Sequence, residues 1–171
     1  MRIVAGRWAG RQLTSPPERS RVRPTSETIR DAWLGLLEPH LKGARVLDLF
    51  AGTGALGLEA LSRGAASADF VESQPASLHA LKANVAALRA RDRCRIFKRD
   101  ALPWAAALEP ERYDIAFADP PYGSRMLDRV IESWQRTRFA RILTVEHAAD
   151  HVLPPGGRRH PFADTSVTIY T

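Results

Sequence analysis

The tetrapeptide Asp119-Pro120-Pro121-Tyr122 holds residues whose types and order suit chemistry on a nitrogen atom. Its two prolines keep the backbone extended and remove two N–H donors, so the segment offers acceptors, the Asp119 carboxylate and the Pro120 carbonyl. Two acceptors that bind the hydrogens of an exocyclic amino group would direct its lone pair at an electrophile. Tyr122 is placed to stack on a flat base. The alternative is a rigid turn at a strand end.

The second such stretch is Val46–Gly57, an apolar run around Asp48 followed by Gly52-x-Gly54-x-x-Gly57. These glycines are typical of a strand–loop–helix that brings the backbone close to a cofactor. Asp48 would repel a pyrophosphate, whereas it suits the cationic amino and sulfonium groups of S-adenosylmethionine. Three alternatives stay open: a turn without a ligand, an Asp48 that only braces the turn, and a nicotinamide dinucleotide.

Two further acidic residues stand at predicted strand ends. Glu72 lies eighteen positions after Gly54, where a carboxylate can accept hydrogen bonds from both hydroxyls of a ribose. It could also cap a helix or face solvent. Asp100 could accept a hydrogen bond from an adenine amino group, or it could simply be the N-cap of the next helix.

Helical and strand patterns alternate between these residues, which predicts βαβ units with right-handed crossovers. A first helix is expected from Thr25 or Ser26 to about Pro39, and a closing antiparallel hairpin at about 157–162 and 166–170. The fold class is therefore α/β, with a mostly parallel sheet that holds ligands beyond the strands' carboxyl ends. Between them we expect strands Val46–Phe50, Ala68–Glu72, Cys94–Lys98, Tyr113–Ala118 and Arg141–Glu146, and helices Ala55–Arg63, Pro75–Leu88, Leu102–Leu108 and Arg125–Trp134.

Length and composition favour one core: the chain has 171 residues, of which 44% are hydrophobic. The single cysteine, Cys94, cannot form an internal disulfide and is expected to fill a strand rather than act as a nucleophile. There is no apolar run of the length of a signal peptide or membrane span. The histidines lack metal-ligand spacing. We expect a cytoplasmic, metal-free, monomeric protein with no membrane partner.

Charge is concentrated at the N-terminus. Residues 1–30 hold seven arginines and two glutamates, so +5 of the net charge of +6 lies there. Arginine forks match phosphate geometry, which favours docking on nucleic acid, although a solvated tail is the alternative. We expect a basic arm over residues 1–24, with a small hairpin from Met1 to Leu13, before a domain over residues 25–171. Trp8 could stack on a base or cover the arm's own core. The expected nucleic-acid contacts are Arg2, Arg7, Trp8, Arg11, Arg21 and Arg23.

Asp48–Gly54 together with Asp119–Tyr122 resembles the class I S-adenosylmethionine-dependent amino-methyltransferases, whose motif is Asp/Asn/Ser-Pro-Pro-Tyr/Phe/Trp. Met1–Gly6, Arg23–Thr25 and Leu47–Arg63 look like the ribosomal RNA small subunit methyltransferase D type, which methylates the N2 amino group of a guanine in 16S rRNA. The likeness covers most of the first 125 residues and is vague beyond about Ser124.

The resemblance implies a Rossmann-like sheet of seven strands, with the small ribosomal subunit or its assembly intermediate as partner. It implies that S-adenosylmethionine lies over Gly52 and Gly54, with its ribose on Glu72 and its adenine near Asp100. The catalytic residues would be Asp119, Pro120, Pro121 and Tyr122. The cofactor-binding residues would be Asp48, Phe50, Ala51, Gly52, Thr53, Gly54, Glu72, Ser73, Asp100 and Ala101.

Three other functions stay open on sequence grounds. Asp-Pro-Pro-Tyr would serve a DNA adenine-N6 or cytosine-N4 methyltransferase equally well, although the chain has little room for a sequence-reading domain beyond the arm. A non-catalytic assembly factor that binds S-adenosylmethionine or RNA is a different class of protein. A nicotinamide dehydrogenase is disfavoured by Asp48, and it has no use for the tetrapeptide.

Overall fold

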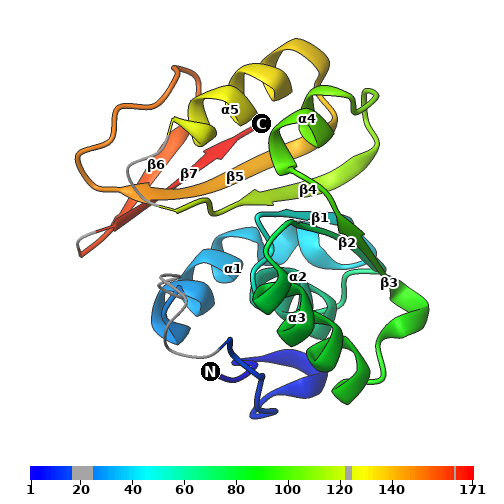
Figure 1. Ribbon diagram of the computed structural model, residues 1–171. Coiled ribbons are helices and arrows are strands. Elements are labelled where there is room, and N and C mark those ends of the chain that lie inside the picture. The colour runs from blue at the N-terminus through cyan, green and yellow to red at the C-terminus, as the bar shows by residue number, and fades with distance from the viewer. Residues whose placement is uncertain (17–24, 122–124, 164) are drawn as a thin grey trace.

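A seven-stranded sheet forms the centre of the computed structural model, which describes residues 1–16, 25–121, 125–163 and 165–171 (Figure 1). In the described chain the strand order is β3-β2-β1-β4-β5-β7-β6. The first five run parallel, whereas β7 is antiparallel to both β5 and β6. This confirms the predicted fold class. The strands are β1 (Arg45–Leu49), β2 (Ser67–Glu72), β3 (Cys94–Lys98), β4 (Tyr113–Ala118), β5 (Ala140–Ala148), β6 (Arg158–Phe162) and β7 (Thr165–Tyr170).

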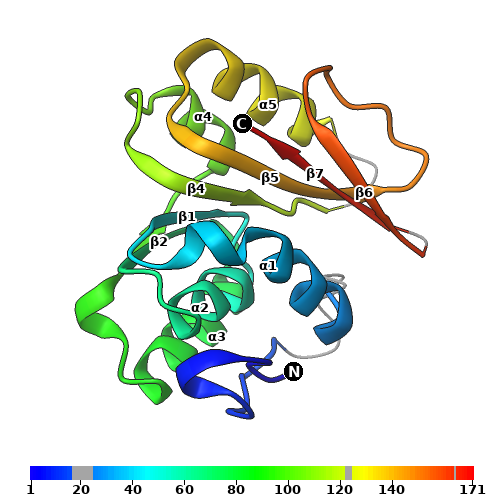
Figure 2. The ribbon, with the colours of Figure 1, turned by 180° about the vertical axis from the view of Figure 1, so that it is seen from behind.

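Helices cover both faces of this sheet, as Figures 1 and 2 show from opposite sides. One face carries α1 (Glu27–Leu41), α2 (Ala55–Ser62) and α3 (Pro75–Ala87), and the other carries α4 (Ala101–Ala106) and α5 (Met126–Thr137). Helix α1 begins at Glu27 because the Ser26 hydroxyl caps it, accepting a hydrogen bond from the Ile29 N–H at 3.2 Å. It runs past Pro39, which lies in its last turn.

Successive residues of the strands contribute side chains to two separate hydrophobic cores, one on each face of the sheet. Val46 and Phe117 point to the side of α1, α2 and α3, and Leu47 and Leu49 point to the side of α4 and α5. Trp33 of α1 is fully buried, and its indole N–H donates to the Thr144 hydroxyl at 2.6 Å. Since both faces are packed, the strands form a rigid platform whose carboxyl edge is the place for ligands.

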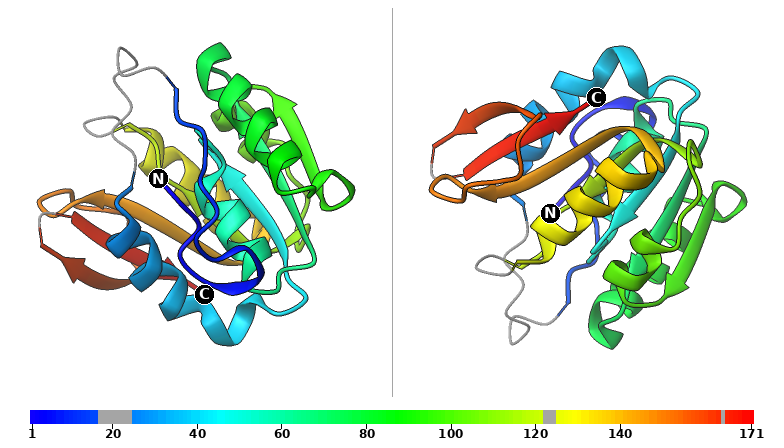
Figure 3. Two further views of the ribbon diagram at one scale, coloured as in Figure 1. Left: turned by 90° about the horizontal axis from the view of Figure 1, so that it is seen from below. Right: turned by 90° about the horizontal axis from the view of Figure 1, so that it is seen from above.

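The N-terminal segment (residues 1–16) lies on the side of the sheet that carries α1, α2 and α3, and it crosses α2 in the view from below (Figure 3). The expected hairpin pairing is present as a single antiparallel bridge, Arg2 to Gln12, and the turn contains a short 3-10 helix, η1 (Gly6–Trp8). Ile3 and Leu13 are buried in the same core as α1 and α2. The segment is therefore packed on the body and continuous with its core.

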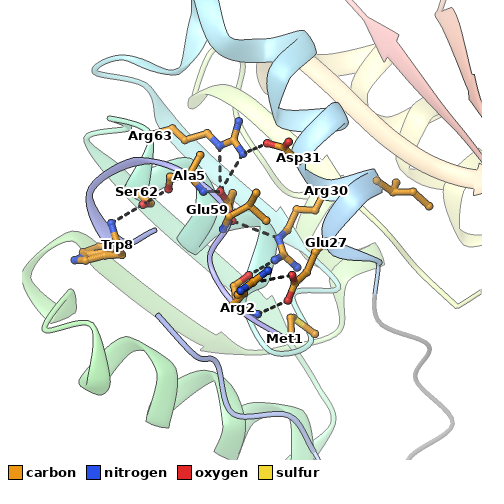
Figure 4. A network of polar contacts seen from close by, with 12 residues as sticks. Met1, Arg2, Ala5, Trp8, Glu27, Arg30, Asp31, Glu59, Ser62 and Arg63 are labelled. Atoms are coloured by element: carbon orange, nitrogen blue, oxygen red, sulfur yellow. Dashed lines mark hydrogen bonds and ion pairs between the residues drawn. The ribbon is translucent and has the colours of Figure 1, made fainter. Parts of the chain in front are cut away.

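The side chain of Glu59, fully buried in α2, anchors this segment (Figure 4). Its two oxygens accept hydrogen bonds from the Val4 and Ala5 N–H groups, both at 2.9 Å. They also bond the guanidinium groups of Arg30 at 3.4 Å and Arg63 at 3.0 Å. Arg30, whose charge was counted with residues 1–30, is fully buried and paired with Glu59.

Candidate active site

The strand order reverses between β1 and β4, and this is where the two sequence motifs meet. Leu49, which precedes the glycine loop, pairs with Ala118, which precedes Asp119. In an open α/β sheet the crevice at such a switch point is the usual ligand site. The fold thus brings the loop and the Asp-Pro-Pro segment side by side at the carboxyl edge.

The loop after β1 has positive φ angles, which few residue types adopt. Phe50, Gly52 and Gly54 have φ values of 60°, 56° and 80°, and the Gly54 N–H closes the turn on the Ala51 carbonyl at 2.7 Å. A side chain on Gly52 would meet no atom within 4 Å, so glycine is required there by φ and leaves open space beside the backbone. Strained positions such as Phe50 are typical of functional loops.

Asp48 lies beneath this loop and is 1% exposed. Its Oδ2 accepts a hydrogen bond from the Gly57 N–H, in the first turn of α2, at 2.9 Å. Burial raises the pKa of Asp48 well above its usual range, the Gly57 N–H opposes that rise, and the neighbouring carboxylates of Asp119 and Glu72 add to it. These contacts support the alternative that Asp48 braces the turn. Its contact with a cationic cofactor stays a prediction.

Glu72, at the end of β2, is bonded to the glycine loop. Its Oε2 accepts from the Gly52 N–H at 2.7 Å, and its Oε1 accepts from the N–H groups of Ser73 at 2.8 Å and Gln74 at 2.7 Å. The carboxylate therefore stands beside the open space at Gly52, and it fixes the loop relative to β2. A role in ribose binding stays a prediction.

Asp100 is exposed, directly before α4. Its Oδ1 accepts a hydrogen bond from the Leu102 N–H at 3.0 Å, so it is the N-cap of α4, one of the two alternatives that the sequence left open. Ala101 after it is buried. Adenine recognition by this pair stays a prediction.

Asp119 is half-buried and takes part in a network that sequence reasoning did not find. The Thr25 hydroxyl lies 2.7 Å from Asp119 Oδ2 and 2.8 Å from Glu146 Oε2, at the end of β5. Burial and the Glu146 charge raise the pKa of Asp119 to about 7, and the Thr25 hydrogen bond opposes this rise. Pro120 is buried and Pro121 exposed. The expected stacking residue, Tyr122, lies outside the described residues.

The basic residues divide into several groups. Arg2 forms an ion pair with Glu27 at 3.1 Å, whereas Arg21 and Arg23 lie outside the described part of the chain. Trp8 is 7% exposed and packs in the core, beneath the guanidinium group of Arg93 at 5.2 Å from its ring centre. These contacts support packing rather than base stacking. An open groove of about 810 Å³ beside it is lined by Arg7, Trp8, Arg11, Ala87, Leu88, Arg89, Ala90, Asp92 and Arg93.

Three further observations concern other parts of the molecule. Burial raises the pKa of the Cys94 thiol to about 12, so a thiolate nucleophile is disfavoured there. Among residues 1–16, 25–121, 125–163 and 165–171, no helix is long and apolar enough to cross a bilayer. The same residues contain no cluster of three or more His, Cys, Asp or Glu side chains that could hold a metal ion.

Comparison with known proteins places this arrangement in a family. The sequence pattern of the family described as "Conserved hypothetical protein 95" matches residues 1–155. The chain belongs to this family. The match extends from the N-terminal segment past β5, so it includes the glycine loop and the Asp-Pro-Pro segment.

Individual relatives confirm the predicted resemblance. "Ribosomal RNA small subunit methyltransferase D" of Escherichia coli K12 is 38% identical over 77% of this chain, and the chain spans 65% of that protein's length. "Putative rRNA methyltransferase YlbH" of Bacillus subtilis is 30% identical over 99% of this chain and 98% of that protein. The solved structure "Putative methyltransferase yhhF from Escherichia coli" has a TM-score of 0.85 at 31% identity, over 99% of this chain and 96% of that one.

Proposed function

We propose that the protein is an S-adenosylmethionine-dependent methyltransferase that modifies the N2 amino group of a guanine in small-subunit rRNA. The observation that carries the proposal is the position of Asp119-Pro120 beside the Gly52–Gly57 loop, where paired strands β1 and β4 end. A glycine loop and a set of hydrogen-bond acceptors thus lie side by side at the carboxyl edge of the sheet. The names of the relatives from E. coli and B. subtilis support methylation of rRNA as the reaction class.

The residues at this edge of the sheet fit a cationic nucleoside cofactor. Gly52 leaves open space beside a backbone of positive φ, and the Glu72 carboxylate is 2.7 Å from its N–H. This carboxylate, together with Asp48 and Asp119 in their ionised forms, creates a field that favours a positive ligand. S-adenosylmethionine, when bound, supplies a methyl group activated by the sulfonium charge. The carboxylate of Asp119 and the carbonyl of Pro120 would orient the substrate amino group toward that methyl group.

Methylation assays test the reaction and its substrate together. Tritiated methyl transfer is measured on 30S particles, on naked 16S rRNA and on duplex DNA, and the labelled nucleotide is mapped by mass spectrometry. We expect label on guanine N2 of RNA, and its loss in Asp119→Ala. Label on DNA alone would support the DNA methyltransferase alternative. Cofactor binding without transfer to any substrate would support a non-catalytic binding protein.

The groove beside Trp8 is the proposed docking surface for RNA. Arg7 and Arg11 from the N-terminal segment and Arg89 and Arg93 after α3 line it, and Asp92 is the acidic residue among them. Four guanidinium groups in one groove suit a phosphate backbone. Asn84 of α3 donates a hydrogen bond to the Thr53 carbonyl of the glycine loop at 3.0 Å, and Ala87 at the end of the same helix lines the groove. The groove therefore lies close to the loop, which suits an RNA that docks beside the place where it is modified.

Replacing Arg7 and Arg11 together by alanine should weaken RNA binding and leave cofactor affinity unchanged. Each phosphate contact contributes about 1 to the slope of log K for RNA binding against log salt concentration. The magnitude of this slope should therefore be smaller by about 2 in the double variant. The matched control is Arg129→Ala with Arg136→Ala, two exposed arginines of α5 on the other side of the sheet. Equal losses of RNA and cofactor affinity in the Arg7/Arg11 variant would contradict a docking role.

A further inference from the structure

Three side chains from distant parts of the sequence converge beside the proposed reaction centre. Thr25 precedes α1, Asp119 follows β4 and Glu146 lies in β5, at separations of 94 and 121 positions from Thr25. The Thr25 hydroxyl oxygen is 2.7 Å from Asp119 Oδ2 and 2.8 Å from Glu146 Oε2. The Glu146 side chain is 3% exposed, and its other oxygen contacts the Thr165 hydroxyl at 3.1 Å. Both Glu146 oxygens therefore lie within hydrogen-bond distance of a threonine hydroxyl.

Counting protons shows that the two carboxyl groups depend on each other. A threonine hydroxyl carries one hydrogen and can donate it to one acceptor at a time. If both carboxyls are ionised, one of them faces the Thr25 oxygen at hydrogen-bond distance with no proton between them. Both hydrogen bonds exist together only when one carboxyl holds a proton and donates it to Thr25 Oγ1. The position of that proton then decides which carboxyl is ionised.

We propose that Thr25 and Glu146 are positioning residues for Asp119, which hold its carboxylate in place and control when it can accept the substrate's amino proton. This inference rests on the proposed function, because it assigns partners to the residue that orients the amino group. Methylation replaces one N–H bond by an N–C bond while the electron pair of the methyl–sulfur bond stays on sulfur, so one proton must leave the nitrogen. Ionised Asp119 takes that proton. It can then donate to Thr25 Oγ1 while Thr25 donates its own hydrogen to Glu146.

The charges around Asp119 determine the direction in which each partner acts. Among the described residues the acidic groups that face it are Glu146 on β5 and Asp48 on β1. Burial and the Glu146 charge raise the pKa of Asp119 to about 7, and the Thr25 hydrogen bond lowers it. The ionised, proton-accepting form of Asp119 thus becomes dominant as pH rises through neutrality. Removing the Glu146 charge and removing the Thr25 hydroxyl should shift this titration in opposite directions.

The test is the pH profile of single-turnover methylation in three variants. For the wild type we expect the rate to rise with pH and reach half its maximum near pH 7. In Glu146→Gln the midpoint should fall by about one pH unit, because a neighbouring like charge is lost. In Thr25→Val it should rise, and the maximal rate should fall, because the donor is lost. Thr25→Ser keeps the hydroxyl and should restore the wild-type profile.

A second readout needs neither cofactor nor RNA. The side-chain carboxyl carbon of Asp119 is followed by NMR against pH in protein with ¹³C-labelled aspartate, and its resonance is assigned by its absence in Asp119→Asn. The same opposite shifts are expected in Glu146→Gln and Thr25→Val. If the midpoints of both readouts stay at the wild-type value, the inference is overturned even where activity is lost. If the NMR shifts appear but wild-type protein methylates no RNA, the link between the three residues stands and the proposed function fails.

Discussion

Replacing Glu59 by glutamine is expected to destabilise the fold strongly, although the two side chains have the same shape. Both Glu59 oxygens accept hydrogen bonds, Oε2 from Val4 and Arg30, and Oε1 from Ala5 and Arg63. The amide group of glutamine would place its NH₂ against two donors in either orientation. It would also leave the fully buried Arg30 guanidinium without its counter-charge. Breaking a buried ion pair in this way costs about 3–5 kcal/mol.

Urea unfolding followed by tryptophan fluorescence measures this loss. A decrease of that size is a large part of the roughly 5–15 kcal/mol that stabilises a typical domain. Amide hydrogen exchange should speed up at Val4 or at Ala5, whichever N–H faces the new NH₂ group and so loses its acceptor. The matched control is Asp31→Asn, a carboxylate 54% exposed that also bonds Arg63, for which we expect about 1 kcal/mol at most. A Glu59→Gln protein within 1 kcal/mol of the wild type would refute the reasoning.

Further expectations concern the loop and the catalytic carboxylate. A methyl group at Gly57 would lie 2.5 Å from the Phe70 ring, so Gly57→Ala should cost about 1–3 kcal/mol of unfolding free energy by urea titration. The methyl group of Gly52→Ala would meet no atom within 4 Å. Calorimetry should therefore show a larger loss in the free energy of cofactor binding than in the free energy of unfolding. Because the folded-state pKa of Asp119 is raised from 3.8 to about 7, its ionisation removes stability as pH rises between these values. The unfolding free energy of Asp119→Asn minus that of the wild type should therefore increase from about pH 4 to about pH 7. A difference that stays constant over this range would contradict the burial of that charge.

Elements with strong local patterns were found where the sequence predicted them. Strands β3 and β4 occupy the predicted residues Cys94–Lys98 and Tyr113–Ala118. Others differ at their ends for tertiary reasons: β5 continues to Ala148 because its last residues pair with β7, down to Thr165. Helix α5 likewise continues beyond Trp134 to Thr137 and ends where Arg138 adopts a left-handed backbone. Such endings depend on neighbours that a local pattern does not contain.

The candidate site was predictable only where its chemistry is contiguous in sequence. The glycine loop and Asp119-Pro120 are local motifs, whereas their meeting depends on the direct pairing of β1 with β4, which the alternation of helices and strands does not determine. Thr25 and Glu146 are single polar residues whose relation appears only when β5 lies beside β4 and the start of α1 lies over both. Glu59 falls in an apolar helix, where a lone acid gives no indication that it binds the N-terminal segment. The burial of Arg30 was likewise not predictable, because its partner Glu59 is 29 positions away.

The acidic residues at the carboxyl edge give the site a consistent electrostatic character. Four adjacent strands, β2, β1, β4 and β5, contribute Glu72, Asp48, Asp119 and Glu146 in that order. Burial and, after it, repulsion from neighbouring carboxylates raise the pKa values of Asp48 and Asp119, so the fold is less stable than one with neutral groups there. A cation in the crevice would offset this repulsion, whereas the phosphates of a dinucleotide would add to it. The same arrangement that lowers stability therefore favours a sulfonium cofactor over a nicotinamide dinucleotide.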